Sequence, residues 1–456
     1  MSTAALPIAT PLSTKKIFSN WWPLAMSWLL MGLELPALSA VIARLDDPEI
    51  HLAAYGGVVF PLALIIEAPV IMLLAASTAL SKDWASYNLL RKYMFSASIL
   101  LTGLHILVAF TPIYYWVVEE ILGAPTAIVE PSRIGLMIMT PWTWAIAYRR
   151  FNQGALIRFG HPRAVSVGTF IRLGTEIVVL LIGFSIGTLP GIVVATSAVA
   201  LGVVAEAIYV AMRIRPVISQ QLIPAPMVNP PLTYRTFANF YIPLALTSLL
   251  SLIVQPIGSA AISRMPLALE SLAVWTVISG LSFLLRSFGI AYNEVVVALL
   301  DESLSFNGLW RFTKILAIAT TSFLLLMQIT PLSDIWFLRI SALPKNLAEI
   351  AKSGLWFALP TPAFAALQSW YQGCILHGRK TRGVPESVVI FLLTATIALG
   401  LGIAMQSITG LYVTLCAYTI SMFTQTIWLK FRSHSTFEHI YERDEVFRKT
   451  VAKKPL

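Results

Sequence analysis

The sequence predicts an all-α polytopic membrane protein with twelve transmembrane helices in two homologous six-helix lobes. Three observations lead to this fold class: long apolar runs, basic residues concentrated in alternate loops, and a repeat between the halves of the chain. Of the 456 residues, 57% are hydrophobic and 12% are charged, whereas a soluble domain carries about 25% charged residues. Most of this chain is therefore expected to lie within lipid.

Long apolar runs define the spans, because about 20 apolar residues cross the hydrocarbon core of a bilayer. The segment before the first run is polar and lacks the charged start and cleavage site of a removable signal peptide. We therefore expect the first span to direct insertion. The twelve runs cover approximately residues 20–43, 53–80, 94–118, 134–150, 164–187, 190–212, 238–263, 271–299, 312–337, 351–372, 385–405 and 409–430.

Basic residues distinguish the two sides of the predicted membrane protein. Pairs such as Lys15-Lys16 and Arg149-Arg150, together with the tail from Lys430 onward, fall on the side of the N-terminus. Lys and Arg are enriched in cytoplasmic loops, so both termini are predicted to be cytoplasmic in the cell (inner or plasma) membrane. The net charge of +10 then reflects topology and attraction to anionic lipid head groups, not binding to nucleic acid.

The two halves of the chain repeat one pattern. At an offset of 220 residues, WPLAMSWLL (22–30) aligns with IPLALTSLL (242–250), and Arg44 aligns with Arg264. Farther along, an offset of 219 aligns Gln153-Gly154 with Gln372-Gly373. The predicted domains are an N-terminal lobe (1–220), a C-terminal lobe (221–430) and a basic cytoplasmic tail (431–456), which we expect to form a solvated helix at the membrane surface. The two Gln-Gly segments, with their neighbouring arginines, are interpreted as cytoplasmic joints between helices.

An even number of spans per lobe gives both lobes the same orientation. This is the parallel-repeat arrangement of some secondary transporters, in which substrate binds between the lobes. Pro36 and Pro256 lie inside the first and seventh spans, where a proline removes a backbone hydrogen bond and bends the helix. We predict kinks there that border the substrate site; kinks that serve packing alone are the alternative.

Ionisable groups inside a membrane are candidates for function. Glu67 and Arg286 lie near the middle of spans 2 and 8, and the repeat aligns Glu67 with Ser287, the neighbour of Arg286. We predict that Arg286 lines the central cleft, within reach of Glu67 in at least one state, and attracts an anionic substrate. A permanent structural ion pair or a protonated Glu67 is the alternative. Further candidates for the cavity are Glu34, Gln255, Asn293 and Glu294, the last two at its cytoplasmic mouth.

Arg172 and Glu176 are four residues apart on the predicted fifth span. Side chains at this spacing are neighbours on a helix and can neutralise each other. The pair is therefore interpreted as a local structural contact.

The start of the second lobe resembles a known family. FYIPLALTSLLSLIVQPIGSAAISR (240–264) is similar to the progressive ankylosis (ANK) pattern of Phe, then Pro-Leu-Ala-Leu, then Pro-Ile and Ser-Arg, and LAAYG (52–56) is similar to its counterpart in the first lobe. The two-lobe plan resembles the multidrug/oligosaccharidyl-lipid/polysaccharide exporter superfamily, which includes the MATE exporters. The resemblance implies a MATE-like, V-shaped exporter, and ANK relatives are associated with outward movement of anions such as ATP, citrate or pyrophosphate.

One position departs from the cation-coupled MATE exporters. Many of them carry an aspartate six residues before the arginine that ends helix 1, whereas counting back from Arg44 gives Leu38. Glu34 lies one helical turn further in. A coupling proton or sodium ion therefore stays open, and no other cofactor or metal is expected.

These observations predict a monomeric secondary exporter, an antiporter that moves small organic or phosphate-bearing anions by alternating access. The alternatives are a MATE-like cation-coupled multidrug exporter and a flippase for lipid or polysaccharide precursors. The sequence contains no GxxxxGK[ST] or HExxH motif, the signatures of phosphate-binding loops and zinc proteases. We therefore do not expect an enzyme.

Overall fold

The computed structural model describes residues 12–302, 304–378 and 382–452, and in this part of the chain it consists of helices and connecting turns without strands. Nine helical stretches there are long and apolar enough to cross a membrane. The more polar α8–α9, α17–α18 and α20 complete the twelve spans. The predicted fold class, an all-α membrane protein of twelve spans in two lobes, is confirmed.

The first half of the chain contains six spans. The described residues include four π-helices (η), of which η1 lies within a span and η2, η3 and η4 end the helices that they follow. The elements of the first half are α1 (Thr14–Gly32), α2 (Glu34–Ile42), α3 (Pro48–Ala54), η1 (Tyr55–Val59), α4 (Phe60–Ile71), α5 (Leu73–Leu80), α6 (Trp84–Phe110), α7 (Ile113–Tyr115), η2 (Trp116–Ile121), α8 (Thr126–Ile138), α9 (Thr140–Arg158), α10 (Pro162–Ile186), α11 (Gly191–Val217) and η3 (Ile218–Leu222).

The second half follows the same order. Its elements are α12 (Tyr234–Leu252), α13 (Val254–Ile262), α14 (Ala268–Leu299), α15 (Ser305–Ile329), α16 (Leu332–Asp334), η4 (Ile335–Ile340), α17 (Lys345–Ala358), α18 (Thr361–His377), α19 (Gly383–Met405) and α20 (Gly410–Ala452).

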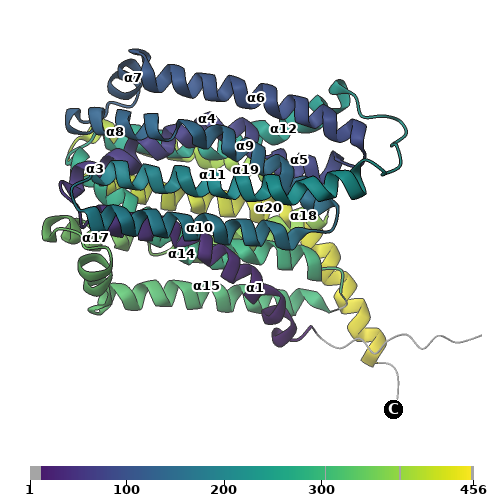
Figure 1. Cartoon of the computed structure of the whole chain (residues 1–456). Coiled ribbons are helices and arrows are strands. Elements are labelled where there is room, and N and C mark those ends of the chain that lie inside the picture. The colour runs from purple at the N-terminus through teal and green to yellow at the C-terminus, as the bar shows by residue number, and fades with distance from the viewer. Residues whose placement is uncertain (1–11, 303, 379–381, 453–456) are drawn as a thin grey trace, which may run out of the picture.

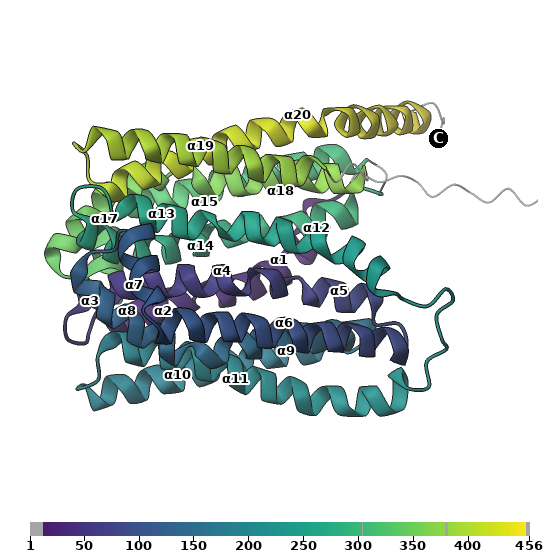
Figure 2. The same cartoon turned by 90° about the horizontal axis from the view of Figure 1, so that it is seen from above.

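The spans run side by side between two faces of the molecule (Figure 1). The connection between α11 and α12 and the C-terminal end of α20 lie at one end, which we call the linker face. The short elements α7, η2, α16 and η4 lie at the other end, the far face. Seen from above, α6 and α9–α11 form one side of the molecule and α18–α20 the other, with α1, α4, α12 and α14 nearer the middle (Figure 2).

The two halves share one hydrophobic core toward the far face. There, one cluster of buried residues contains side chains from both halves, such as Leu38, Leu62 and Leu272. Toward the linker face, the described residues form two separate clusters: one of second-half residues with the start of α1, and one of first-half residues with the start of α12. The halves therefore diverge from a shared core at the far face.

The first spans of the two halves exchange places near the linker face. The start of α1 packs in the core of the second half, and the Trp21 indole donates a hydrogen bond to the carbonyl of Phe288 (2.9 Å). The start of α12 packs in the core of the first half, and the Tyr241 hydroxyl donates to the carbonyl of Pro69 (2.5 Å). Trp21 and Tyr241 are repeat equivalents at offset 220, so the two contacts mirror each other.

Spans 1 and 7 are both interrupted. The break falls at Leu33 between α1 and α2, and at Ile253 between α12 and α13. Each break lies three residues before a proline, Pro36 or Pro256. A proline ring clashes with the carbonyl four residues earlier and leaves it without its helical donor, which accounts for the interruptions.

The π-helix η1 adds one residue to span 2 and changes the register of the repeat. Thr276, on the uninterrupted α14, bonds to the carbonyl of Leu52 in the turn before η1 (3.0 Å). A Cβ on Gly56 would lie 1.8 Å from the Thr276 hydroxyl, so these repeat equivalents at offset 220 meet directly between the halves.

Beyond η1 the offset is 219. Gly154 packs against Leu74 and Ser77, and its equivalent Gly373 packs against the matching residues of α14 at offset 219, Asn293 and Val296. A residue inserted into a helix is accommodated as such a π-bulge. The alignment of Glu67 with Ser287 is therefore wrong: the structural equivalent of Glu67 is Arg286.

Two arginines tie the halves together at the far face. Arg44 donates hydrogen bonds to the carbonyls of Arg339 (2.6 Å) and Ile340 (3.0 Å), at the end of η4. Its equivalent Arg264 donates to the carbonyls of Glu120 (3.1 Å), Ile121 (2.8 Å) and Leu122 (2.8 Å), at the end of η2. Each half thus caps the last carbonyls of a helix from the other half.

The C-terminal tail is helical, and its expected place at the membrane surface stays a prediction. α20 continues from the last span to Ala452 without interruption. Asp444 accepts hydrogen bonds from the amides of Leu304 (3.2 Å) and Phe306 (2.9 Å), and Arg443 donates to the carbonyls of Leu300 and Glu302. The tail is therefore fixed to the turn between α14 and α15.

Candidate functional site

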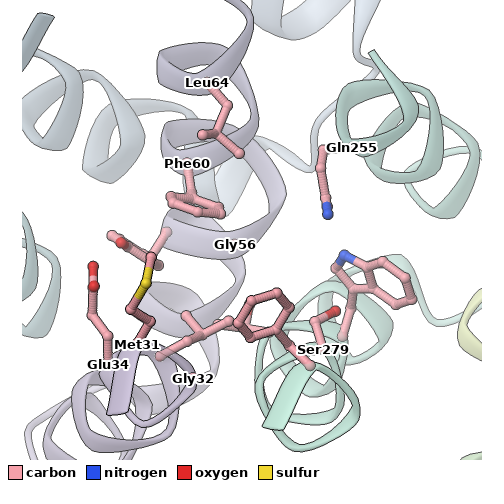
Figure 3. A pocket seen from close by; sticks show the side chains of 13 residues that line it. Met31, Gly32, Glu34, Gly56, Phe60, Leu64, Gln255 and Ser279 are labelled. Carbon is pink, nitrogen blue, oxygen red and sulfur yellow. The ribbon is translucent and has the colours of Figure 1, made fainter. Parts of the chain in front are cut away.

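Three adjoining cavities run from the centre of the molecule toward the linker face. The first, about 290 Å³, lies beside the break in span 1. Met31 and Glu34 border it from the first half, while Gln255 and Ser279 reach it from the second (Figure 3). The second, about 380 Å³, shares Gln255 and Ser279 with the first and extends into the second half.

The third cavity, about 330 Å³, continues from the second toward the linker face. Arg286 and Gln368 line both, so the three spaces follow one another. Asn293 and Glu294 also line the third cavity, and the side chain of Glu294 is exposed. The structure thus places five of the six predicted cavity residues along these spaces: Glu34, Gln255, Arg286, Asn293 and Glu294.

Arg286 is the cation between the second and third cavities. It lies on α14, partly buried, and its buried Nε has no hydrogen-bond partner in the described part of the chain. Among the same residues, no carboxylate lies within 4.0 Å of its guanidinium. A guanidinium does not readily deprotonate. A free permanent charge therefore faces these cavities.

Glu67 lies elsewhere. It is buried inside the first half, where it interacts electrostatically with Arg149, Arg150 and Arg172. Its Oε2 has no hydrogen-bond partner among the described residues. This structure does not bring Glu67 and Arg286 together, and their contact in another state stays a prediction.

The first half holds a cluster of seven charged side chains, of which five are buried and two, Glu34 and Arg150, are half-buried. Arg149 contacts Glu206 (Nη1–Oε2 2.8 Å), although these atoms are not aligned as a hydrogen bond, and Gln153 donates to the other carboxylate oxygen of Glu206 (2.7 Å). Arg172 contacts Glu34 (Nη2–Oε2 2.8 Å). We call this group the first-half cluster; its charged members are Glu34, Glu67, Arg149, Arg150, Arg172, Glu176 and Glu206.

Two interpretations of these residues from the sequence were wrong. Arg149 and Gln153 are not in a cytoplasmic loop: both are buried within α9 and face the centre of the first half. Arg172 does not pair mainly with Glu176, which lies at 3.8 Å, but with Glu34 from span 1. The repeat aligns Arg149 with the uncharged Gln368, so the charge is specific to the first half. This difference between the halves was the signal in the sequence that could have revealed the cluster.

Three charged residues of the first-half cluster have neutral equivalents in the second half. At offset 219, Arg149 corresponds to Gln368, Arg172 to Phe391 and Glu206 to Gln425, and these three equivalents all line the second cavity. Gln368 donates weakly to Gln425 (3.2 Å) in place of an ion pair. Arg149, Arg172 and Glu206 thus line none of the three cavities, whereas their neutral equivalents all border the second.

Comparisons with known proteins support the fold. No protein-family model and no curated protein sequence matches the chain. Among solved structures, a lipid II flippase MurJ in an inward closed conformation is 14% identical, with a TM-score of 0.71 over 95% of this chain and 93% of that one. A MATE family multidrug transporter of the MOP superfamily in an inward-facing conformation is 15% identical, with a TM-score of 0.64 over 91% of this chain and 98% of that one.

A third structure is a MOP superfamily transporter from Pyrococcus furiosus, described as having a binding pocket of reverse polarity. It is 16% identical, with a TM-score of 0.59 over 94% of this chain and 97% of that one. At such identities the similarity is one of fold. The chain has the fold of MOP superfamily transporters.

Proposed function

We propose that this protein is a secondary exporter of small organic or phosphate-bearing anions, an antiporter that binds its substrate at Arg286 and works by alternating access. The observation that carries the proposal is the unpaired guanidinium that lines two cavities formed mostly by the second half. An unpaired charge in a membrane interior is costly, and an anionic ligand would remove that cost. The ANK-like segment described above is consistent with an anionic substrate.

The conformation is consistent with one step of such a cycle. The cavities extend toward the linker face, where the halves have separate cores, while Arg44 and Arg264 join the halves at the far face. In parallel-repeat transporters, one lobe rocks against the other around a central site. Rupture of the far-face contacts would complete the alternation.

The first-half cluster supplies a place for a coupling proton. Its four glutamates face three arginines, so full ionisation leaves one negative charge in excess, and Glu67 carries an oxygen without a hydrogen-bond partner. We therefore favour a proton over a sodium ion.

Transport by reconstituted protein tests the proposal. Wild type, Arg286→Gln, Arg286→Lys and Glu67→Gln would be compared in proteoliposomes for pH-gradient-driven movement of radiolabelled organic anions, including citrate and a nucleotide. A hydrogen bond to a charged group contributes about 1.5–3 kcal/mol, so Arg286→Gln should reduce anion transport roughly 10- to 100-fold. Arg286→Lys should retain part of the activity, and Glu67→Gln should mainly change its pH dependence.

The matched control is Arg311→Gln, because Arg311 is an exposed residue of α15 that lines none of the three cavities. It should transport as wild type does. Undiminished anion transport by Arg286→Gln would contradict the proposal. Transport of organic cations or lipid-linked precursors instead would favour the multidrug or flippase alternative.

A further inference from the structure

We propose that the substrate is an amphipathic monoanion, a single carboxylate or phosphate-type group carried by an aromatic or other apolar body, and not a small polyanion. This inference rests on the proposed function and narrows the substrate class at the same site. It depends on the number of free charges along the cavities and on the side chains that surround them.

The first argument is the charge count. Among the described residues that line the three cavities, Arg286 is the one cation, and the two acids are Glu34 and Glu294. Glu34 is already paired with Arg172 at 2.8 Å. Glu294 is exposed at the mouth, away from the deeper spaces. The interior therefore offers one uncompensated positive charge, enough for one negative charge.

A small polyanion would lack partners here. Each additional negative charge taken from water into a low-dielectric site needs its own cation or set of donors. Of the other arginines inside the molecule, Arg149 and Arg172 are held by Glu206 and Glu34 in the first-half cluster. Arg150 belongs to the same cluster and lines none of the three cavities. Citrate or pyrophosphate would have to break those ion pairs or remain partly unpaired.

The second argument is the wall of the second cavity. Trp275 packs edge-on against Tyr418 (ring centroids 5.4 Å apart), and Tyr418 packs against Phe391 (5.7 Å). The Tyr418 hydroxyl donates to the carbonyl of Val254 (2.6 Å), so its polar end is committed and the ring remains as lining. Phe283 joins this cavity to the first.

These rings suit a flat apolar body. Aromatic side chains contribute large contact areas and prefer offset or edge-to-face partners. The second cavity, about 380 Å³, lies within the range of ligand pockets, which are mostly apolar with a few placed polar groups. A ligand whose carboxylate contacts Arg286 would extend its body toward Trp275 and the Gln255 amide.

Binding to the full-length protein tests this assignment. Competition would be measured in nanodiscs with indole-3-acetate as the labelled probe and, as competitors, its neutral isostere indole-3-acetamide, acetate, citrate and pyrophosphate. We expect indole-3-acetate to bind and the amide and acetate each to compete at least ~10-fold more weakly, because each lacks one of the two recognised features. Citrate and pyrophosphate should compete no better than acetate.

Variants distinguish recognition of the negative charge from recognition of the apolar body. Arg286→Gln should weaken indole-3-acetate at least ~10-fold while leaving the weak binding of the amide unchanged, and Arg286→Lys should recover much of the loss. Phe283→Ala should weaken indole-3-acetate and the amide alike without affecting acetate. Arg311→Gln should match wild type, and a gel-filtration profile like that of wild type would show that each variant is folded.

The outcomes distinguish this inference from the proposed function. If citrate or pyrophosphate binds more tightly than indole-3-acetate in an Arg286-dependent manner, the monoanion assignment is wrong and the anion exporter stands. If indole-3-acetate and its amide bind equally, or Phe283→Ala has no effect, the assignment is also wrong. If neither monoanions nor polyanions depend on Arg286, the proposed function fails with it.

Discussion

Arg149 and Glu206 form a buried ion pair on α9 and α11, and their equivalents Gln368 and Gln425 form a neutral contact in the second half. Removing one partner of a buried pair leaves an uncompensated charge and costs about 3–5 kcal/mol, whereas replacing both is often nearly neutral. The second half shows that this backbone accepts two glutamines. This comparison is possible because the repeat gives each of these two positions an equivalent in the other half of the same chain.

Arg149→Gln and Glu206→Gln should therefore each lower the thermal midpoint by several degrees, and the double variant should recover most of the loss. Intrinsic tryptophan fluorescence during heating in detergent would measure this. Gln368→Ala/Gln425→Ala serves as the comparison without a change of charge. A double variant as unstable as either single variant would contradict the ion-pair interpretation.

Arg286 was predictable as a cavity residue because a charge in an apolar span stands out in sequence. Glu67 stands out in the same way but lies in the first-half cluster. Which charged side chains contact one another in the folded protein was less predictable. The assignment of Arg149 and Gln153 to a cytoplasmic loop followed from basic residues at the end of an apolar run, but α9 extends to Arg158 and carries both inside. Side-chain partners from α9, α10 and α11 become visible only when the helices are packed.

At the level of the helices, Asp83 in the turn between α5 and α6 fixes the long connection between α11 and α12. Asp83 caps α6 by accepting from the Ser86 amide (2.7 Å), and its other oxygen accepts from the Val228 amide in the connection between the halves (2.7 Å). Burial alone would raise the pKa of Asp83, but the hydrogen bonds from Ser86 and Val228 outweigh it and lower the pKa. The ionised carboxylate of Asp83 thus joins the connection between α11 and α12 to the start of α6.

Asp83→Ala should lower the thermal midpoint at pH 7, because a lost N-cap costs about 0.5–2 kcal/mol. Since the folded-state pKa is depressed, the stabilisation is present above the unfolded pKa of about 3.9 and is lost as the pH falls through the folded value. The difference between wild type and Asp83→Ala should then shrink below pH ~4. The control Asp301→Ala, at an exposed position, should have the thermal midpoint of wild type at each pH. A difference between wild type and Asp83→Ala that does not change with pH would contradict this explanation.

The repeat in the sequence predicted the paired breaks in spans 1 and 7, because proline acts on its own helix. It did not predict η1. A change of offset from 220 to 219 was visible between residue 53 and residue 111, yet nothing in the local composition located the extra residue. The π-bulge forms at Tyr55–Val59, where Gly56 leaves room for Thr276. Its position depends on a contact between halves, so the sequence alone could not show it.

Considered as a whole, the molecule is joined at the far face and divided toward the linker face. Arg44 and Arg264 connect the halves through five hydrogen bonds to carbonyls of η4, η2 and the residue after η2. Both side chains also bond within their own helix, to Ala40 and Ala260. They are therefore oriented before the halves meet, which favours the closed far face.

The double variant Arg44→Ala/Arg264→Ala should shift the protein toward a state open at the far face. Hydrogen bonds to charged groups contribute about 1.5–3 kcal/mol each, less where exposed, so a population shift of roughly 10- to 100-fold is expected. Electron–electron distance measurements would follow it with spin labels at residues 119 and 338 on the far face and 82 and 301 on the linker face, after replacement of the free Cys374 and Cys416. The first distance should lengthen and the second shorten.

Arg133→Ala is the matched control, because Arg133 is an arginine near the same face that bonds within its own half, to Tyr115 and to the carbonyls of Ala109 and Phe110. Its removal should leave both distances unchanged. The single variants Arg44→Ala and Arg264→Ala should each produce part of the shift, since each removes the contacts of one arginine. If the double variant keeps the wild-type distances at both faces, the shared core alone holds the halves together and the arginines do not control the far face.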